Sequence, residues 1–283
     1  MTWAVAVHGG AKTISPDQEE ANRAGCLAAL SSARAILDAG GSSLDAVEAA
    51  IRVLELDPTF NAGVGSVRDA DGRVTMDAAI MDGSTLDVGA VAAITGVRNP
   101  ISVARLMLRD APILLVGDGA TRFAVARGAE LSDRQADPSE SGHDTVGCVA
   151  LDADGRLAAG TSTGGLDGTL PGRVGDSPLP GCGFYADDSL GAVALSGDGE
   201  NIARMTIASR IMRELEGSEV QDAAERGIAA LQRIGGEAGA ITVSRDGEVG
   251  WAHNSSHFAV AWATSGEPEG RVSLQRHHQG GAQ

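Results

Sequence analysis

The sequence predicts a protein of mixed helices and strands, in which sheets are sandwiched between layers of helices. Three segments, 66–83, 145–165 and 240–254, repeat one pattern: an apolar strand, an Asp-Gly turn and a second strand. Amphipathic helix patterns lie before and between these hairpins. No strand runs through a glycine-rich loop into a helix, as a dinucleotide or P-loop site requires. Hairpins combined with helices favour the layered arrangement over a parallel doubly wound sheet.

The first half of the chain begins with a short buried strand, residues 2–10, that ends in a glycine turn. A long helix is predicted next. Ser15 is a good N-cap, Pro16 suits the first helical position, and the Gly40-Gly41 pair stops the helix. Three further helices are predicted in this half: one from near Ser43 to just before Asp57, one near Ile101–Arg109 and one near Ala120–Arg127.

The composition changes at residues 128–143, which hold a single large aliphatic residue, Leu131, among many Ser, Asp, Glu and Pro residues. Such a segment is predicted to be an exposed, mobile connector. After it the second hairpin begins at Thr145, two helices are predicted at 201–215 and 220–234, and the third hairpin follows. The polar, glycine-rich tail, 265–283, is expected to fray.

Composition limits the functions that the chain can have. Its 283 residues can bury a large core, and the net charge of −16 argues against nucleic acid or an anionic membrane as a partner. Lys12 is the only lysine, so nearly all positive charge is on arginine. The three cysteines show no metal-site spacing, and Cys26 and Cys148 are expected to be buried thiols. Without a signal peptide or a bilayer-spanning run, the chain is expected to be soluble and cytoplasmic.

The second hairpin begins on a threonine directly after the polar connector. A threonine hydroxyl is a poor nucleophile until a base takes its proton, and a free α-amine, with a pKa of about 8, can be that base. An N-terminal threonine therefore carries both nucleophile and base. For Thr145 this requires cleavage of the bond between Asp144 and Thr145. Taken alone, the position is more simply explained by a β-forming residue at the start of a strand.

Residues 160–164, Gly-Thr-Ser-Thr-Gly, match the G-x-S-x-G pattern of a nucleophile elbow. An elbow must turn directly from a strand into a helix, whereas this segment continues with glycines and Pro171. The elbow is therefore disfavoured. The hydroxyls of this segment are better placed to surround Thr145 from a neighbouring strand.

Two later loops carry groups that suit an amino-acid substrate. In the first, Arg173 can grip a carboxylate with two parallel hydrogen bonds, and Asp176 can accept from an ammonium group. In the second, Ser196 offers a hydroxyl and Gly197 a backbone N–H, both suitable donors for an oxyanion hole. Each loop also has an ordinary structural explanation, a salt-bridged surface turn for the first and a helix N-cap for the second.

Together these motifs closely resemble the plant-type L-asparaginase and isoaspartyl peptidase family of N-terminal-nucleophile hydrolases. The matching segments appear in the family's order over nearly the whole chain: HGGA, FNAGVGSV, TMDAAIMDG, HDTVGCVALD, GTSTGG, LPGRVGDSP and SGDGE. The resemblance implies an α+β fold, a four-layer αββα sandwich, as a single domain over 1–283. It also implies self-cleavage into an α subunit, 1–144, ending in the connector, and a β subunit, 145–283. An (αβ)₂ dimer that needs no cofactor is expected.

The resemblance also assigns roles to residues. Thr145 matches the nucleophile, and Thr163 the residue whose hydroxyl bonds to it. Arg173 and Asp176 match the residues that hold the α-carboxylate and α-amine of the substrate, and Ser196 and Gly197 match the oxyanion-hole pair. Gly199 matches a substrate-binding residue, and Asn61 matches an asparagine beside the active site. The loop from Leu54 to Val64 matches a loop whose backbone carbonyls often hold a sodium ion in the family.

The chain departs from the family pattern at two positions, one in this set and one at the cleavage site. Ser196 replaces the usual threonine, which keeps the hydroxyl but loses the methyl group that fixes its rotamer. Asp144 stands where asparaginases often have glycine. The segments HDT and PGCGFYADD are closer to the related glycosylasparaginases, whereas TSTGG, LPGR and FNAG match the asparaginase branch.

The expected activity is hydrolysis of a small-molecule substrate, either the side-chain amide of asparagine or a β-aspartyl dipeptide. Glycosylasparaginase, the same chemistry with a sugar on the leaving amide, is the nearest alternative. A non-catalytic amino-acid-binding protein of the same fold is the other. An intact Arg173 and Asp176 pair in a chain that is never cut would support that alternative.

Overall fold

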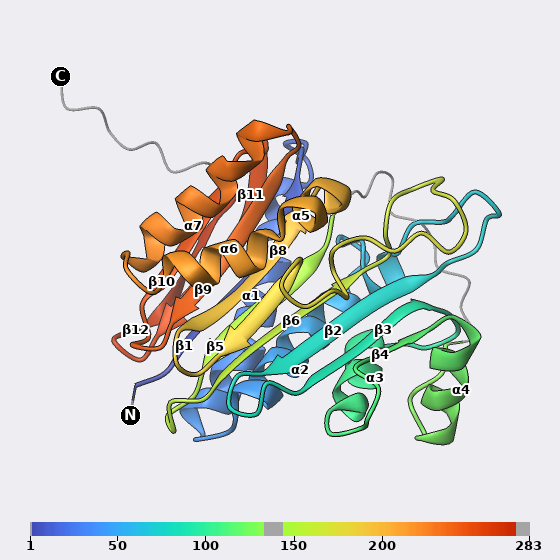
Figure 1. Cartoon of the computed structure of the whole chain (residues 1–283), viewed down its shortest axis with the longest axis horizontal. Coiled ribbons are helices and arrows are strands. Elements are labelled where there is room, and N and C mark those ends of the chain that lie inside the picture. The colour runs from blue at the N-terminus through green and yellow to red at the C-terminus, as the bar shows by residue number, and fades with distance from the viewer. Residues whose placement is uncertain (1, 133–143, 276–283) are drawn as a thin grey trace.

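The computed structural model describes residues 2–132 and 144–275. Two β-sheets pack face to face, and helices cover the outer face of each, which gives four layers in the order helix, sheet, sheet, helix (Figure 1). The predicted α+β sandwich is confirmed.

The larger sheet has eight strands in the described chain, in the order β12-β11-β1-β5-β6-β2-β3-β4. All neighbours are antiparallel except β3 and β4, which are parallel. The strands are β1 (Ala4–Lys12), β2 (Met76–Asp82), β3 (Val88–Ile94), β4 (Leu114–Val116), β5 (Val146–Leu151), β6 (Leu157–Thr163), β11 (His257–Thr264) and β12 (Glu267–Ser273). The strand that follows Thr145 therefore lies at the centre, between β1 and β6.

The smaller sheet has four described strands in the order β10-β9-β8-β7, all antiparallel. They are β7 (Phe184–Asp187), β8 (Gly191–Gly197), β9 (Ala238–Ser244) and β10 (Val249–His253). Val149 and Leu157 of the large sheet pack with Phe184 and Ile241 of the small sheet in one apolar layer. This contact sets the distance between β5, which Thr145 directly precedes, and β8, which carries Ser196 near its end.

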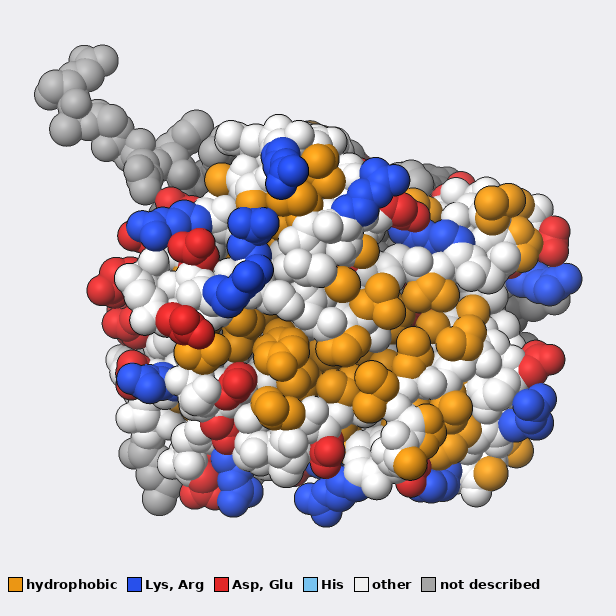
Figure 2. Space-filling view, viewed as in Figure 1, with side chains coloured by type: hydrophobic (Ala, Val, Ile, Leu, Met, Phe, Trp, Pro, Cys, Tyr) orange, Lys and Arg blue, Asp and Glu red, His pale blue; other side chains and the backbone are white. Residues whose placement is uncertain are grey.

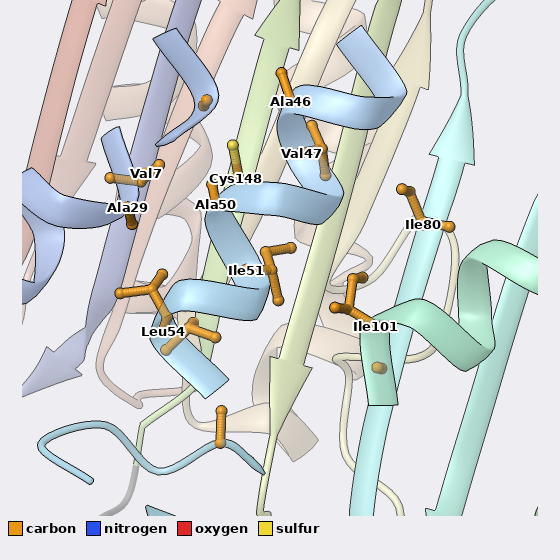
Figure 3. Packing of buried hydrophobic residues seen from close by; sticks show 14 of the residues in the cluster. Val7, Ala29, Ala46, Val47, Ala50, Ile51, Leu54, Ile80, Ile101 and Cys148 are labelled. Atoms are coloured by element: carbon orange, nitrogen blue, oxygen red, sulfur yellow. The ribbon is translucent and has the colours of Figure 1, made fainter. Parts of the chain in front are cut away.

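Helices α1 (Glu19–Asp38), α2 (Ser43–Glu55) and α3 (Pro100–Met107) pack on the large sheet. Figure 3 shows Ile51 and Leu54 of α2 facing this layer, with Cys148 of β5 and Ile101 of α3 nearby. Cys26 and Cys148 are both fully buried, as predicted. Helix α4 (Asp118–Ala126) lies beside β3 and β4, and η1 (Gly63–Gly65) is a short 3₁₀ turn.

Helices α6 (Ile207–Glu214) and α7 (Val220–Ala229) cover the small sheet, together with α5 (Gly199–Met205) and the 3₁₀ turn η2 (Ala230–Arg233). One continuous helix was predicted over 201–215, and this is wrong. Thr206 has a φ of 47°, and this left-handed residue ends α5 and separates it from α6. The predicted helix at 220–234 is confirmed as far as Ala229 and then tightens into η2.

The predicted start of the first helix is wrong. Residues 16–18 form a turn in which the Gln18 N–H donates to Ser15 O at 2.9 Å, and α1 begins at Glu19 without a side-chain cap. The Ser15 hydroxyl is used by Asp17 instead. Helix α2 does begin at Ser43, with Ser42 as its cap, and α3 and α4 lie where they were predicted.

The first predicted hairpin is also wrong in its first strand. Residues 66–75 contain no strand, because Asp69 Oδ1 accepts the N–H groups of Asp71 and Arg73 and holds the segment in a turn. Strand β2 pairs with β3 and β6 instead. The other two hairpins, β5–β6 and β9–β10, are confirmed.

The tail is ordered further than expected, because β12 pairs with β11 as an edge strand. Residues 276–283 lie outside the described residues, as does most of the predicted connector, 133–143. The connector's first part is described, and Leu131 forms an isolated bridge with Val97. Within the described ranges, no helix has the length and hydropathy to cross a bilayer. Figure 2 shows apolar side chains gathered across the middle of one face, with charged side chains mainly around them.

Candidate active site

Thr145 lies at the entrance of β5, where the two sheets meet at one end of the sandwich. Its side-chain Oγ1 is 3.1 Å from Ser177 Oγ, and its backbone N–H donates to Ser196 Oγ at 3.1 Å. Only 7% of Thr145 is exposed. A small pocket opens beside it and is lined by Asp144, Thr145, Thr163, Gly165, Leu166, Arg173, Asp176, Ser177 and Gly197. Six of the predicted site residues therefore line one pocket.

The carbonyl group of the Asp144–Thr145 peptide bond is held from two sides. Asp144 O accepts a hydrogen bond from Asn61 Nδ2 at 3.2 Å and another from Thr163 Oγ1 at 3.1 Å. The Asp144 side chain accepts the Asn61 N–H at 3.1 Å through Oδ1, and its Oδ2 forms an ion pair with Lys12. These contacts fix the position of the carbonyl group next to Thr145.

Thr163 thus bonds to the carbonyl oxygen next to Thr145 in the uncut chain. Its neighbours in the same strand point elsewhere: Thr161 Oγ1 donates to Ser177 O at 2.7 Å, and Ser162 Oγ donates to buried Glu55 at 2.7 Å. The expectation that this whole segment surrounds Thr145 is therefore too broad. After β6 the chain enters a loop and not a helix, so the nucleophile elbow is excluded.

Ser196 is fully buried at the end of β8, and its hydroxyl oxygen accepts two N–H groups, from Ala11 at 3.0 Å and from Thr145 at 3.1 Å. Since both bonds use the oxygen, the hydroxyl proton is left to donate beside Thr145. Gly197 follows with a φ of 145°, and a Cβ there would lie 2.2 Å from Glu237 O. The close approach of these two backbones requires glycine.

Arg173 and Asp176 lie on the loop that forms the far side of the pocket. The Nε and Nη2 edge of Arg173 is occupied by Glu200, at 2.9 and 2.7 Å, which leaves Nη1 on the side of Gly165 and Gly175. Asp176 is buried, and its Oδ2 has no hydrogen-bond partner. Burial raises the pKa of Asp176 to about 7, although the positive charge of Arg173 opposes the shift. An unpaired buried carboxylate oxygen is costly and suits a cationic ligand.

Gly199 lies between these two groups. A Cβ at this position would be 2.8 Å from Asp176 Oδ1 and 3.1 Å from Arg173 Nη2. Any larger residue would therefore push into the space between carboxylate and guanidinium.

The loop from Leu54 to Val64 carries Asn61 into the site. It folds back so tightly that a Cβ at Gly65 would lie 2.2 Å from Phe60 O and 2.9 Å from Pro58 O. Backbone carbonyl oxygens that converge in this way are suitable ligands for a hard cation.

Comparison with known proteins assigns the chain to a family. The model of the family described as Asparaginase matches residues 1–139 and 131–271. The chain belongs to the asparaginase family. This confirms the resemblance and makes the chain a hydrolase.

The chain is similar to curated relatives along nearly its full length. It is 40% identical over 290 residues to "Isoaspartyl peptidase/L-asparaginase" of Bos taurus, covering 94% of both chains. It is 39% identical over 290 residues to the Homo sapiens protein of the same name, again covering 94% of both chains. It is 38% identical over 299 residues to "Isoaspartyl peptidase" of Escherichia coli (strain K12), covering 93% of both.

Sequence reasoning did not assign roles to four residues that the structure places at the site. They are Lys12, Asp77, Ser177 and Glu200. Asp77 is a carboxylate inside the apolar strand β2, where burial raises its pKa to about 6 and where it accepts the Ala93 N–H at 2.7 Å. Asp77 comes one residue before the apolar run Ala78–Met81, and an acid at this position in a strand could have been noticed in the sequence. The other three are recognisable only from contacts between distant segments.

Proposed function

We propose that the chain hydrolyses the side-chain amide of L-asparagine and the amide bond of β-aspartyl dipeptides, releasing L-aspartate. The observation that carries the proposal is the buried Asp176 carboxylate, whose Oδ2 has no hydrogen-bond partner, beside the Arg173 guanidinium in the same pocket as Thr145. This pair suits the free ammonium and carboxylate of an aspartyl head. The relatives named above support the same choice of substrates.

We propose that the chain first cuts itself between Asp144 and Thr145. The Thr145 hydroxyl attacks the Asp144 carbonyl carbon, and its proton passes to the Thr145 nitrogen as the peptide C–N bond breaks. Asn61 Nδ2 and Thr163 Oγ1 already donate to the oxygen on which negative charge develops. Water then hydrolyses the resulting ester, which releases the Asp144 carboxylate and leaves Thr145 with a free hydroxyl beside its free α-amine.

In the cut enzyme the Thr145 amine acts as the base for its own hydroxyl. The hydroxyl attacks the β-carbonyl carbon of the substrate, and Ser196 Oγ–H and the Gly197 N–H stabilise the oxyanion. The amine then gives its proton to the leaving nitrogen, and ammonia or an amino acid departs. Water attacks the acyl-enzyme and releases aspartate. Arg173 and Asp176 hold the head throughout.

No cofactor takes part in these steps. We propose that a sodium ion, held by backbone carbonyls of the loop from Leu54 to Val64, stiffens the segment that carries Asn61. The convergence of the Pro58 and Phe60 carbonyls supports this role. We also propose an (αβ)₂ dimer in the cytoplasm, and the apolar region in Figure 2 supports association with a second copy.

A panel of substrates on one enzyme preparation tests the proposed function. We expect hydrolysis of β-Asp-Leu and asparagine. Glutamine should react on the order of a hundredfold more slowly, because its extra methylene displaces the amide from Thr145 by about 1 Å or more. N-acetylasparagine should fail, because it has no ammonium for Asp176. A kcat/KM for N-acetylglucosaminyl-asparagine more than about tenfold above the others would instead identify a glycosylasparaginase.

The pH dependence provides a second test. Asp176 must be ionised to receive the substrate ammonium, and with its pKa raised to about 7 it loses its charge as the pH falls below that value. The Thr145 amine must also be deprotonated. Protonation of either group therefore lowers log kcat/KM as the pH falls. In the complex the substrate ammonium keeps Asp176 ionised, so only the amine affects log kcat. We expect a steeper acid limb for kcat/KM than for kcat. Identical limbs would contradict the role of Asp176.

A further inference from the structure

Lys12, at the end of β1, is held in an enclosed position beside the bond that is to be cut. Its ammonium group pairs with Asp144 Oδ2, lies 3.5 Å from Thr59 O and sits 5.5 Å from the centre of the Phe60 ring. Its side chain is 11% exposed, and the Asp144 side chain is completely buried. An ammonium in such surroundings needs an anion, because leaving a desolvated charge unpaired is costly.

The Asp144 side of Thr145 is also where the leaving group of a substrate must lie. The Thr145 amine returns a proton to the leaving nitrogen, so that nitrogen must be within hydrogen-bond reach of the Thr145 nitrogen. In the uncut chain Asp144 occupies the position of the leaving group, since its carbonyl carbon is bonded to the Thr145 nitrogen. After cleavage Asp144 is attached to the chain on one side only, so it can move away, and a leaving group can then enter its place.

The carboxylate of a leaving amino acid would reach the same point as the Asp144 side chain. From the Thr145 nitrogen, the bonds through Asp144 to its carboxylate carbon add up to about 6 Å. A hydrogen bond to a leaving nitrogen, followed by its two bonds to the α-carboxylate carbon, also spans about 6 Å. The second carboxylate can therefore replace the first.

We propose that Lys12, with the Asn61 backbone N–H that now binds Asp144 Oδ1, forms a subsite for the α-carboxylate of the leaving amino acid. The preferred substrates are then β-aspartyl dipeptides with a free C-terminal carboxylate. Asparagine has no group for this subsite, and a glycosylated asparagine places a neutral sugar there. The inference rests on the proposed function and names the substrate class of that same site.

The decisive comparison uses the wild-type enzyme with β-Asp-Leu and β-Asp-leucinamide. The two substrates have the same head and the same leucine side chain and differ in the terminal carboxylate. We expect a kcat/KM at least about tenfold higher for the free acid, a difference of about 1.4 kcal/mol. Equal values for two hydrolysed substrates would overturn the inference and leave the proposed function standing. Hydrolysis of neither would refute the proposed function itself.

Two variants then assign the preference to Lys12. In Lys12→Met the ratio between the acid and the amide should fall to about one, whereas in Lys12→Arg most of it should remain. Arg226→Met, which removes a distant exposed cation paired with Glu214, is the matched control and should keep the full ratio. Kinetics are normalised to the cut fraction, because Lys12 also contacts Asp144. An unchanged ratio in Lys12→Met would overturn the assignment. If Lys12→Met stays uncut, the wild-type ratio decides.

Discussion

Thr145→Ala should be recovered as one uncut chain without detectable amidase activity. The substitution removes the hydroxyl that lies 3.1 Å from Ser177 Oγ, and with it the nucleophile for both self-cleavage and hydrolysis. The wild-type protein should instead run under denaturing conditions as two fragments, 1–144 and 145–283. N-terminal sequencing of the second fragment should begin Thr-Val-Gly-Cys. Intact mass and asparagine turnover measured on the same samples provide the test.

Thr121→Ala is the matched control for this experiment. Its hydroxyl is also hydrogen-bonded, to Thr95 O at 3.3 Å, but it belongs to α4, away from the pocket. This variant should cut itself and remain active. An active Thr145→Ala, or a wild-type chain that hydrolyses asparagine while uncut, would refute the N-terminal-nucleophile mechanism.

Arg173→Ala should lower kcat/KM for asparagine and β-aspartyl dipeptides. The expected loss of transition-state stabilisation is about 2–5 kcal/mol. The substrate carboxylate would lose its partner, and two buried carboxyl groups, Asp77 and Asp176, would lose a neighbouring positive charge. Arg173→Lys should not restore full activity. An ammonium group cannot bind Glu200 through two parallel bonds and still present a third donor in a fixed plane.

Self-cleavage provides the internal control for Arg173→Ala. The contacts to the Asp144 carbonyl come from Asn61 and Thr163, so the variant should still separate into two fragments. A cut variant with wild-type kcat/KM would show that Arg173 does not hold the substrate. An uncut variant would show that the loop supports the bond as well as the substrate.

The sequence predicted those parts of the fold that depend on neighbouring residues. The β5–β6 and β9–β10 hairpins are specified by Asp-Gly turns, and α2 by its Ser42 cap. Strand β8 was missed because its small residues, Gly-Ala-Val-Ala-Leu-Ser-Gly, carry little strand preference and gain stability from distant partners. The break at Thr206 was missed for a similar reason. One left-handed residue leaves the amphipathic pattern on both sides intact.

The sequence motifs of the site were predictable, but the contacts between side chains from distant segments were not. Thr145, Arg173 and Asp176 each lie in a recognisable segment, and the structure brings them to one pocket. Glu200 holds Arg173 from the start of α5, and Lys12 reaches Asp144 from β1, which lies 132 positions earlier in the chain. Such pairs have no fixed spacing, because their separation depends on how the sheets pack.

The strand order has a consequence for the protein after cleavage. Strand β1 belongs to the first fragment and lies between β5 and β11 of the second, while β6 pairs with β2 of the first. The two polypeptides would therefore be interleaved within one sheet, and neither could leave without breaking the ladder on both sides. A precursor can find this arrangement as a single molecule. Once cut, a denatured enzyme must reassemble from two molecules, so its recovery depends on concentration. Cleavage would thus replace a folding reaction within one molecule by a bimolecular one, and a denatured, cut enzyme would refold poorly at low concentration.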